Sequence, residues 1–157
     1  MTPLDSQTPK GQICIAAEEY VASRICEMWG CSALRLGAEA AHFDRLFHRG
    51  GQIVAVAEIK NRDMDWEQLV AFGSYLITAK KLEQGAQLAR LLSAPFYLFV
   101  RLGDSKDMVY WPVANTDGDI VVAHTIRRTQ TQATVNGGIA VRDNAYLSLE
   151  DAVRKCI

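Results

Sequence analysis

Two carboxylates and a lysine are spaced so that one β-hairpin would bring them together. Glu58 and Lys60 stand two residues apart in the apolar run IVAVAEIK, and thirteen residues separate Asp44 from Glu58. Between them lies Gly50-Gly51, and glycine accepts the positive φ that a tight hairpin turn demands. Folding the chain about these glycines leaves two registers open, with Asp44 opposite either Ala57 or Glu58.

In the second register the two carboxylates are directly opposed, with Cβ atoms about 5 Å apart. Lys60 shares the face of Glu58, because alternate residues of a strand point the same way. Carboxylates this close repel each other, and Mg²⁺ compensates them well, since it takes hard oxygen ligands and acidifies its bound water. A lysine beside the ion orients the attacking water or neutralises charge on a phosphate. The pattern therefore predicts a metal-dependent phosphodiesterase site.

A simpler interpretation makes Glu58 and Lys60 an exposed ion pair, worth under about 1 kcal/mol. The residues around them are almost continuously apolar, which is typical of a strand covered on both faces. The apolar flanks therefore disfavour simple exposure of this pair.

Residues 11–29 are expected to form the first helix, with Gly30 as its C-cap. Glu18 falls on the apolar stripe of this helix, and a buried carboxylate needs a partner because an unpaired buried charge is costly. Glu18 could therefore complete the carboxylate cluster, or it could lie at the edge of the stripe. The stripe recurs at spacings of three and four and contains Cys14, Val21, Ala22, Ile25 and Trp29.

A second helix is expected over 65–81, with Asp65 as its N-cap. Lys80-Lys81 would then lie at its C-terminal end, where cations complement the helix dipole. Residues 82–93 would extend this helix or form a short third one. The later elements expected are a strand over 95–102, the strands MVYWPV and IVVAHTI, and a short terminal helix capped by Ser148.

This order predicts a single α/β domain over 11–157 with a largely mixed sheet, after a loose tail at 1–10. The 157 residues suffice for one domain with a core, and the 49 % apolar and 22 % charged content is ordinary for a globular protein. The four cysteines show no Cys-x-x-Cys spacing, so a zinc or iron–sulfur site is not expected. No apolar run is long enough for a membrane span and the N-terminus does not resemble a signal peptide, so a cytoplasmic protein is expected.

The formal net charge of −1 argues against binding nucleic acid through bulk charge alone. A local basic face remains compatible with it. The cations that could contact phosphates are Arg62, Lys80, Lys81, Arg101, Arg127 and Arg128.

Asp44 followed by Glu58-Ile59-Lys60 resembles the PD-(D/E)xK nuclease superfamily, the fold of many restriction enzymes and Holliday-junction resolvases. The resemblance covers roughly residues 11–113. Glu18 and Val21 match the Glu-x-x-Val pattern of the family's first helix, and FDRLF matches its metal-aspartate strand. It implies a restriction-endonuclease-like fold, in which a central mixed β-sheet is flanked by helices around an αβββαβ core.

The resemblance also implies the roles of the site residues. Asp44 and Glu58 would bind Mg²⁺ or Mn²⁺, with the backbone carbonyl of Ile59 as a further ligand, and Lys60 would assist the attacking water. Glu18 would support the site, and Gln68 would correspond to a glutamine of the following helix.

The sequence departs from the family's pattern in three places. Phe43 rather than proline precedes Asp44, Gln68 is followed at the fourth position by Phe72 rather than tyrosine, and the iron–sulfur cysteines of some relatives are absent. The second departure argues against the exonuclease-like branch with a Gln-x-x-x-Tyr signature.

The leading hypothesis is a Mg²⁺-dependent DNA endonuclease, structure-selective in the manner of junction resolvases, acting as a homodimer and suited to a phage or mobile element. The alternative is a non-catalytic nucleic-acid-binding or assembly module of the same fold. A third hypothesis is an unrelated α/β protein in which the Asp, Glu and Lys pattern is a coincidence.

Overall fold

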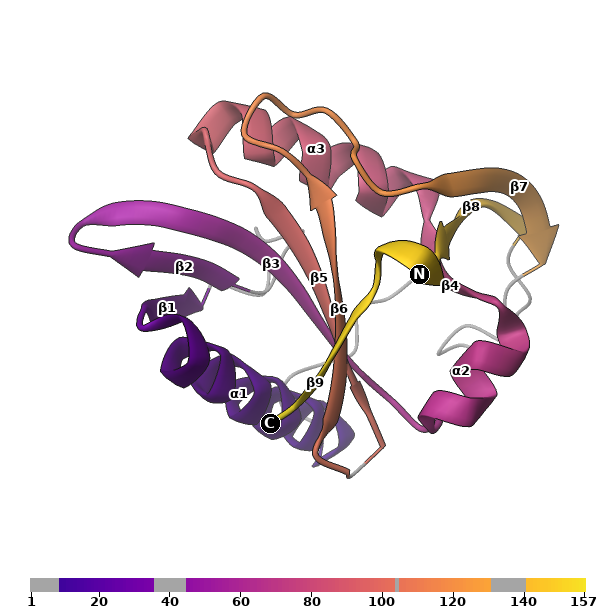
Figure 1. Ribbon diagram of the computed structural model, residues 1–157, viewed down its shortest axis with the longest axis horizontal. Helices are drawn as coiled ribbons and strands as arrows, with labels where there is room; N and C mark the ends of the chain where they lie inside the picture. The colour runs from indigo at the N-terminus through magenta and orange to yellow at the C-terminus, as the bar shows by residue number, and fades with distance from the viewer. Residues whose placement is uncertain (1–8, 36–44, 104, 131–140) are drawn as a thin grey trace.

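The computed structural model of the protein describes residues 9–35, 45–103, 105–130 and 141–157 (Figure 1). Residues 1–8 of the predicted tail over 1–10 and the Asp44 position lie outside the described residues, and α1 already begins at Pro9. The described helices are α1 (Pro9–Trp29), α2 (Trp66–Phe72), α3 (Ala79–Leu92) and a short 3-10 turn (Leu149–Asp151). The described strands are β1 (Ser32–Arg35), β2 (Arg45–Arg49), β3 (Gln52–Arg62), β4 (Ser74–Thr78), β5 (Phe96–Leu102), β6 (Asp107–Ala114), β7 (His124–Gln130), β8 (Val141–Ser148) and β9 (Val153–Cys156).

The main sheet has the strand order β1-β2-β3-β5-β6-β9. Strands β3 and β5 run parallel and the other neighbours run antiparallel, so the sheet is mixed, as predicted. A second, antiparallel sheet has the order β4-β8-β7 and lies beside the start of α3 (Figure 1). The α/β fold class is therefore confirmed, with an additional small sheet that the sequence did not predict.

Helices α1 and α3 cover opposite faces of the main sheet, and β3 between them is buried on both sides (Figure 1). Val56 of β3 packs in the core with α3, whereas Ala57 and Ile59 pack in the core with α1. This alternation follows from the period of two in a strand. It confirms the prediction of a strand covered on both faces.

The apolar stripe of α1 is confirmed where the structure describes it. Val21, Ala22 and Ile25 are buried in the core against the sheet, and Gly30 follows the helix with φ of 60°. Trp29 meets a group of aromatic rings at their edges: Phe47, Tyr97, Phe99 and Tyr110.

The predicted single helix over 65–81 is wrong. Helix α2 ends at Phe72 because Gly73 adopts a left-handed conformation, with φ of 78°, and its N–H bonds back to Leu69 and Val70. The next five residues form β4, which pairs with β8 far along the chain, and Thr78 caps a new helix, α3. The alternative of a separate third helix is therefore the one that the structure bears out.

This correction moves Lys80 and Lys81 from the end of a helix to the first turn of α3. Cations there oppose the helix dipole rather than complement it, so the predicted dipole role is also wrong.

The predicted terminal helix is wrong as well. Ser148 does act as a cap, accepting a hydrogen bond from the N–H of Glu150, but the turn that it caps is only three residues long. The chain then forms β9, which adds to the edge of the main sheet beside β6. Ser148 is therefore confirmed as a cap. The residues after the turn form a strand because they pair with β6.

Candidate active site

Strands β2 and β3 form the predicted hairpin around Gly50 and Gly51, whose φ angles are 56° and 78°. Arg45 lies opposite Ala57, as the second of the two predicted registers requires. A shift in register between Phe47 and His48 marks a bulge near the turn. Asp44, the predicted partner of Glu58, lies outside the described residues, so its place in the site stays a prediction.

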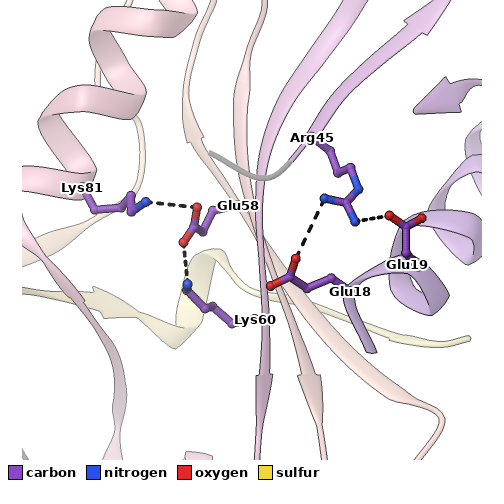
Figure 2. A network of polar contacts seen from close by, with 6 residues as sticks. All are labelled: Glu18, Glu19, Arg45, Glu58, Lys60 and Lys81. Carbon is purple, nitrogen blue, oxygen red and sulfur yellow. Dashed lines mark hydrogen bonds and ion pairs between the residues drawn. The ribbon is translucent and has the colours of Figure 1, made fainter. Parts of the chain in front are cut away.

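Glu58 is a buried carboxylate held between two lysines (Figure 2). Only 2 % of the residue is exposed. Lys60 Nζ lies 2.7 Å from Glu58 Oε1, and Lys81 Nζ lies 3.2 Å from Glu58 Oε2. A charge removed from water requires compensation of this kind, because an unpaired buried carboxylate is strongly unfavourable. The simple exposed ion pair is therefore excluded by the burial of Glu58.

Lys81 reaches Glu58 because α3 packs closely on the sheet. Its inward face carries small residues, among them Gly85, and a Cβ at that position would overlap the ring of Phe96 on β5. Thr78 caps the helix by accepting the N–H of Lys81 at 3.2 Å, which fixes where the first turn begins. Sequence reasoning missed Lys81 as a site residue, because 23 residues separate it from Glu58.

Tyr75 is a second neighbour of the site that sequence reasoning missed. It lies on β4, is buried, and its hydroxyl accepts a hydrogen bond from Arg62 Nε at 3.0 Å. Burial raises the pKa of the Tyr75 phenol, Arg62 and Lys60 partly oppose this shift, and Glu58 adds to it. A neutral phenol, two lysines and a carboxylate therefore form one electrostatic neighbourhood.

Glu18 lies against Arg45 rather than against the two lysines (Figure 2). Arg45 Nη1 is 3.9 Å from Glu18 Oε2, and Arg45 Nη2 is 2.7 Å from Glu19 Oε1. Arg45 faces the same side of the sheet as Ala57, which is the α1 side, whereas Glu58 faces the α3 side. Glu18 has the partner that its stripe position required, and its role in the site stays a prediction.

Gln68 is exposed and takes part in a capping box at the start of α2. Its Oε1 accepts the N–H of Asp65 at 2.9 Å, and its own N–H donates to Asp65 Oδ1 at 2.8 Å. Asp65 is thus confirmed as the N-cap. The structure gives Gln68 a local structural role, and its role in chemistry stays a prediction.

Ile59 is buried in the core on the α1 side, and its carbonyl as a metal ligand also stays a prediction. Within the described ranges, no group of three His, Cys, Asp or Glu side chains is placed to hold a metal ion. Glu58 supplies the oxygen donors that a hard divalent cation prefers, and a bound ion would replace one of the two ammonium groups that compensate this carboxylate. The residue that would make it a two-carboxylate site is Asp44.

A mixed sheet between two helices, with a buried Glu and its Lys on the strand after a Gly-Gly hairpin, agrees with the PD-(D/E)xK arrangement expected from the sequence. Residues 11–131 match the family described as "Phage putative PDDEXK endonuclease", and the chain belongs to that family. The match extends past residue 113, where the resemblance from the motifs ended.

No protein of curated function matches the sequence. Among solved structures, the chain is similar to Archaeoglobus fulgidus Hjc, a Holliday junction resolvase from an archaeal hyperthermophile. The sequences are 21 % identical, the TM-score is 0.46, and the match covers 62 % of this chain and 75 % of that one. Across the described residues, no helix is both long and apolar enough to cross a membrane.

Proposed function

We propose that this protein is a Mg²⁺- or Mn²⁺-dependent endonuclease that hydrolyses phosphodiester bonds of DNA. The observation that supports the proposal best is the buried carboxylate of Glu58, held 2.7 Å from Lys60 on a strand within the family match. Lys60 and Lys81 compensate this carboxylate, and a catalytic metal ion, when bound, would take over part of that compensation.

In the proposed mechanism, Asp44 and Glu58 would hold the ion, with the carbonyl of Ile59 as a further ligand. When bound, the ion makes its water more acidic and stabilises negative charge on the phosphate. The Lys60 side chain is 37 % exposed, so its ammonium can contact both Glu58 and a water or phosphate arriving from solvent. Glu18 and Gln68 would act as supporting residues of the active site.

The chemical step is an in-line displacement at phosphorus. The water oxygen bonds to phosphorus, the bond from phosphorus to the leaving sugar oxygen breaks, and the leaving oxygen takes up a proton. The proton lost by the water passes to solvent. Lys60 orients the water and offsets charge on the phosphate oxygens during this step.

The sequence contains no zinc-finger spacing and no recognition-helix motif, so reading of a base sequence is not part of the proposal. We propose selection by DNA structure, such as a branch or four-way junction, by a homodimer that places two sites on paired strands. A cytoplasmic location agrees with this substrate.

The test is cleavage of a panel containing linear duplex, single strand, flap and four-way junction DNA, with Mg²⁺, Mn²⁺ or EDTA. Wild type should cut in either metal, and Lys60→Ala should lose about 10²-fold or more of the rate, as expected for loss of a group that stabilises the transition state. Lys155→Ala, an exposed lysine on β9, is the matched control and should cut normally.

Two results would contradict the proposal. One is an absence of cutting on every substrate together with no heat of Mg²⁺ binding in calorimetry, which would favour the non-catalytic binding module. The other is cutting that Lys60→Ala leaves intact, which would place the chemistry elsewhere.

A further inference from the structure

A cavity lies next to the proposed active site, between the first turn of α3 and the β7–β8 hairpin. Its volume is about 660 Å³. The small sheet β4-β8-β7 forms one wall, and Figure 1 shows this sheet at the end of the molecule where α3 begins. The charged residues that line it are Lys80, Lys81, Glu83, Arg128, Arg142 and Asp143.

The lining is basic, although the whole chain carries a formal net charge of −1. It contains four cations and two carboxylates. One of these carboxylates, Asp143, accepts a hydrogen bond from Arg128 at 3.1 Å and so offsets one cation. A concave surface with excess positive charge concentrates anions.

The position of the two lysines in α3 also favours an anion in the cavity. Lys80 and Lys81 occupy the first turn of a fourteen-residue helix, where the helix dipole disfavours cations. Glu58 compensates Lys81 at 3.2 Å, and Lys80 is the second lysine of this turn in the cavity lining. An anion in the cavity would be attracted by the lysines and by the helix terminus together.

Lys81 connects the cavity to the active site. Its side chain lines the cavity, and its Nζ lies 3.2 Å from Glu58 Oε2. Glu58 in turn contacts Lys60, the proposed catalytic lysine. A group bound in the cavity would therefore lie one side chain away from the reacting phosphate.

Exposed positive charge extends beyond the cavity onto β7. The Arg128 side chain is 74 % exposed on β7. Its neighbour Arg127 lies with its guanidinium 4.0 Å from the centre of the Tyr146 ring on β8. Neighbouring residues of a strand point to opposite faces, so Arg128 extends the positive charge of the cavity while Arg127 places exposed charge on the other face of β7.

We propose that this cavity binds a backbone phosphate of the DNA strand next to the phosphate that is cut. The inference rests on the proposed nuclease function and adds to it the small β4-β8-β7 sheet as a DNA-binding element. Lys80 and Arg142 line the cavity but take no part in the proposed chemistry. Variants of these two residues therefore test the cavity separately from the active site.

The test is DNA binding by fluorescence anisotropy in EDTA, where no cutting occurs, from 50 to 200 mM salt. The variants are Lys80→Gln, Arg142→Gln and their combination, and the control is Lys106→Gln, an exposed lysine in the β5–β6 turn. Each single variant should reduce the slope of log K against log salt by about 1, and the combination by about 2. Binding at the lowest salt should weaken about tenfold for each lost contact. The control should match wild type.

Circular dichroism melting checks that each variant is folded. If Arg142→Gln does not fold, Lys80→Gln alone still tests the inference. Unchanged slopes in folded variants would overturn the inference. Titration with inorganic phosphate, followed by NMR of the α3 amides, separates the two sources of phosphate. Binding of free phosphate without any change in the DNA slope would also overturn it.

Failure of the inference and failure of the proposed function are distinguishable. If Lys60→Ala abolishes cutting while the cavity variants keep the wild-type salt slope, the nuclease stands and the cavity site does not. If the slopes fall as expected but no substrate is cut, the DNA-binding site stands and the nuclease activity does not.

Discussion

The arrangement around Glu58 predicts a specific pattern of non-additive stability changes. Lys60→Met and Lys81→Met each remove one of two ammonium groups from a residue that is only 2 % exposed. At an effective dielectric constant of about 20, the distances of 2.7 and 3.2 Å correspond to gross Coulomb attractions of about 6 and 5 kcal/mol. Desolvation cancels much of this, and the lysine side chains are 37 % and 28 % exposed.

Each single variant should therefore lower the free energy of unfolding by only about 1–2 kcal/mol, because the other lysine still compensates Glu58. The double variant leaves the buried carboxylate without either lysine and should lose about 3–5 kcal/mol, more than the sum of the singles. For a chain of this length, that corresponds to a fall in Tm of roughly 6–20 °C. Adding Glu58→Gln to the double variant removes the charge and should restore about 2 kcal/mol.

The assay is urea denaturation followed by circular dichroism, in EDTA at neutral pH, with Lys155→Met as a control expected within about 0.5 kcal/mol of wild type. Repeating the double variant with Mg²⁺ should raise its stability, since the ion would replace the missing positive charge. Simple additivity of the two lysine variants, with no recovery on Glu58→Gln, would refute the interpretation of Glu58 as a buried charge shared by both lysines.

Two further predictions concern packing and titration near the site. Gly85→Ala should destabilise the protein by about 1–3 kcal/mol in the same urea assay, because the added methyl group overlaps the Phe96 ring and α3 must move off the sheet; a neutral result would mean that the α3–β5 contact is looser than described. Tyr75 should titrate above the ordinary phenol pKa in ultraviolet absorbance, and Arg62→Met should raise that pKa further, since Arg62 lowers it. Its folded pKa is the raised one, so its contribution to stability is complete below the unfolded pKa of about 10 and is lost as pH rises through the folded value. A Tyr75 titration at the ordinary pH would contradict the burial that causes the shift.

Local signals were sufficient for the first half of the active site. The hairpin could be predicted because Gly50 and Gly51 adopt the positive φ of a tight turn and the strands around them alternate with a period of two. The same alternation placed Glu58 and Lys60 on one face, and the structure confirms their contact. The PD-(D/E)xK family followed from these residues and their spacing, and the family match bears it out.

Other local signals were present but their consequence was misjudged. Gly73 is a C-cap and Thr78 an N-cap, and both residue types are typical of those positions. The break between α2 and α3 could therefore have been predicted from the sequence. The helical spacing of apolar residues across 65–81 obscured it. The residues between the two caps became a strand because β8, more than sixty residues away, provides its hydrogen-bonding partner.

What the tertiary structure alone decided is which charges meet. The sequence determined that Glu18 and Glu58 would each need a partner, because a buried carboxylate is costly without one. It did not determine that Arg45 would meet Glu18, that Lys81 would meet Glu58, or that Lys80 and Arg128 would line one cavity. These pairings join residues of separate helices and strands, and they depend on how α1 and α3 pack on the two faces of the sheet. Packing of that kind is set by long-range contacts, to which the periodicity of a single segment is insensitive.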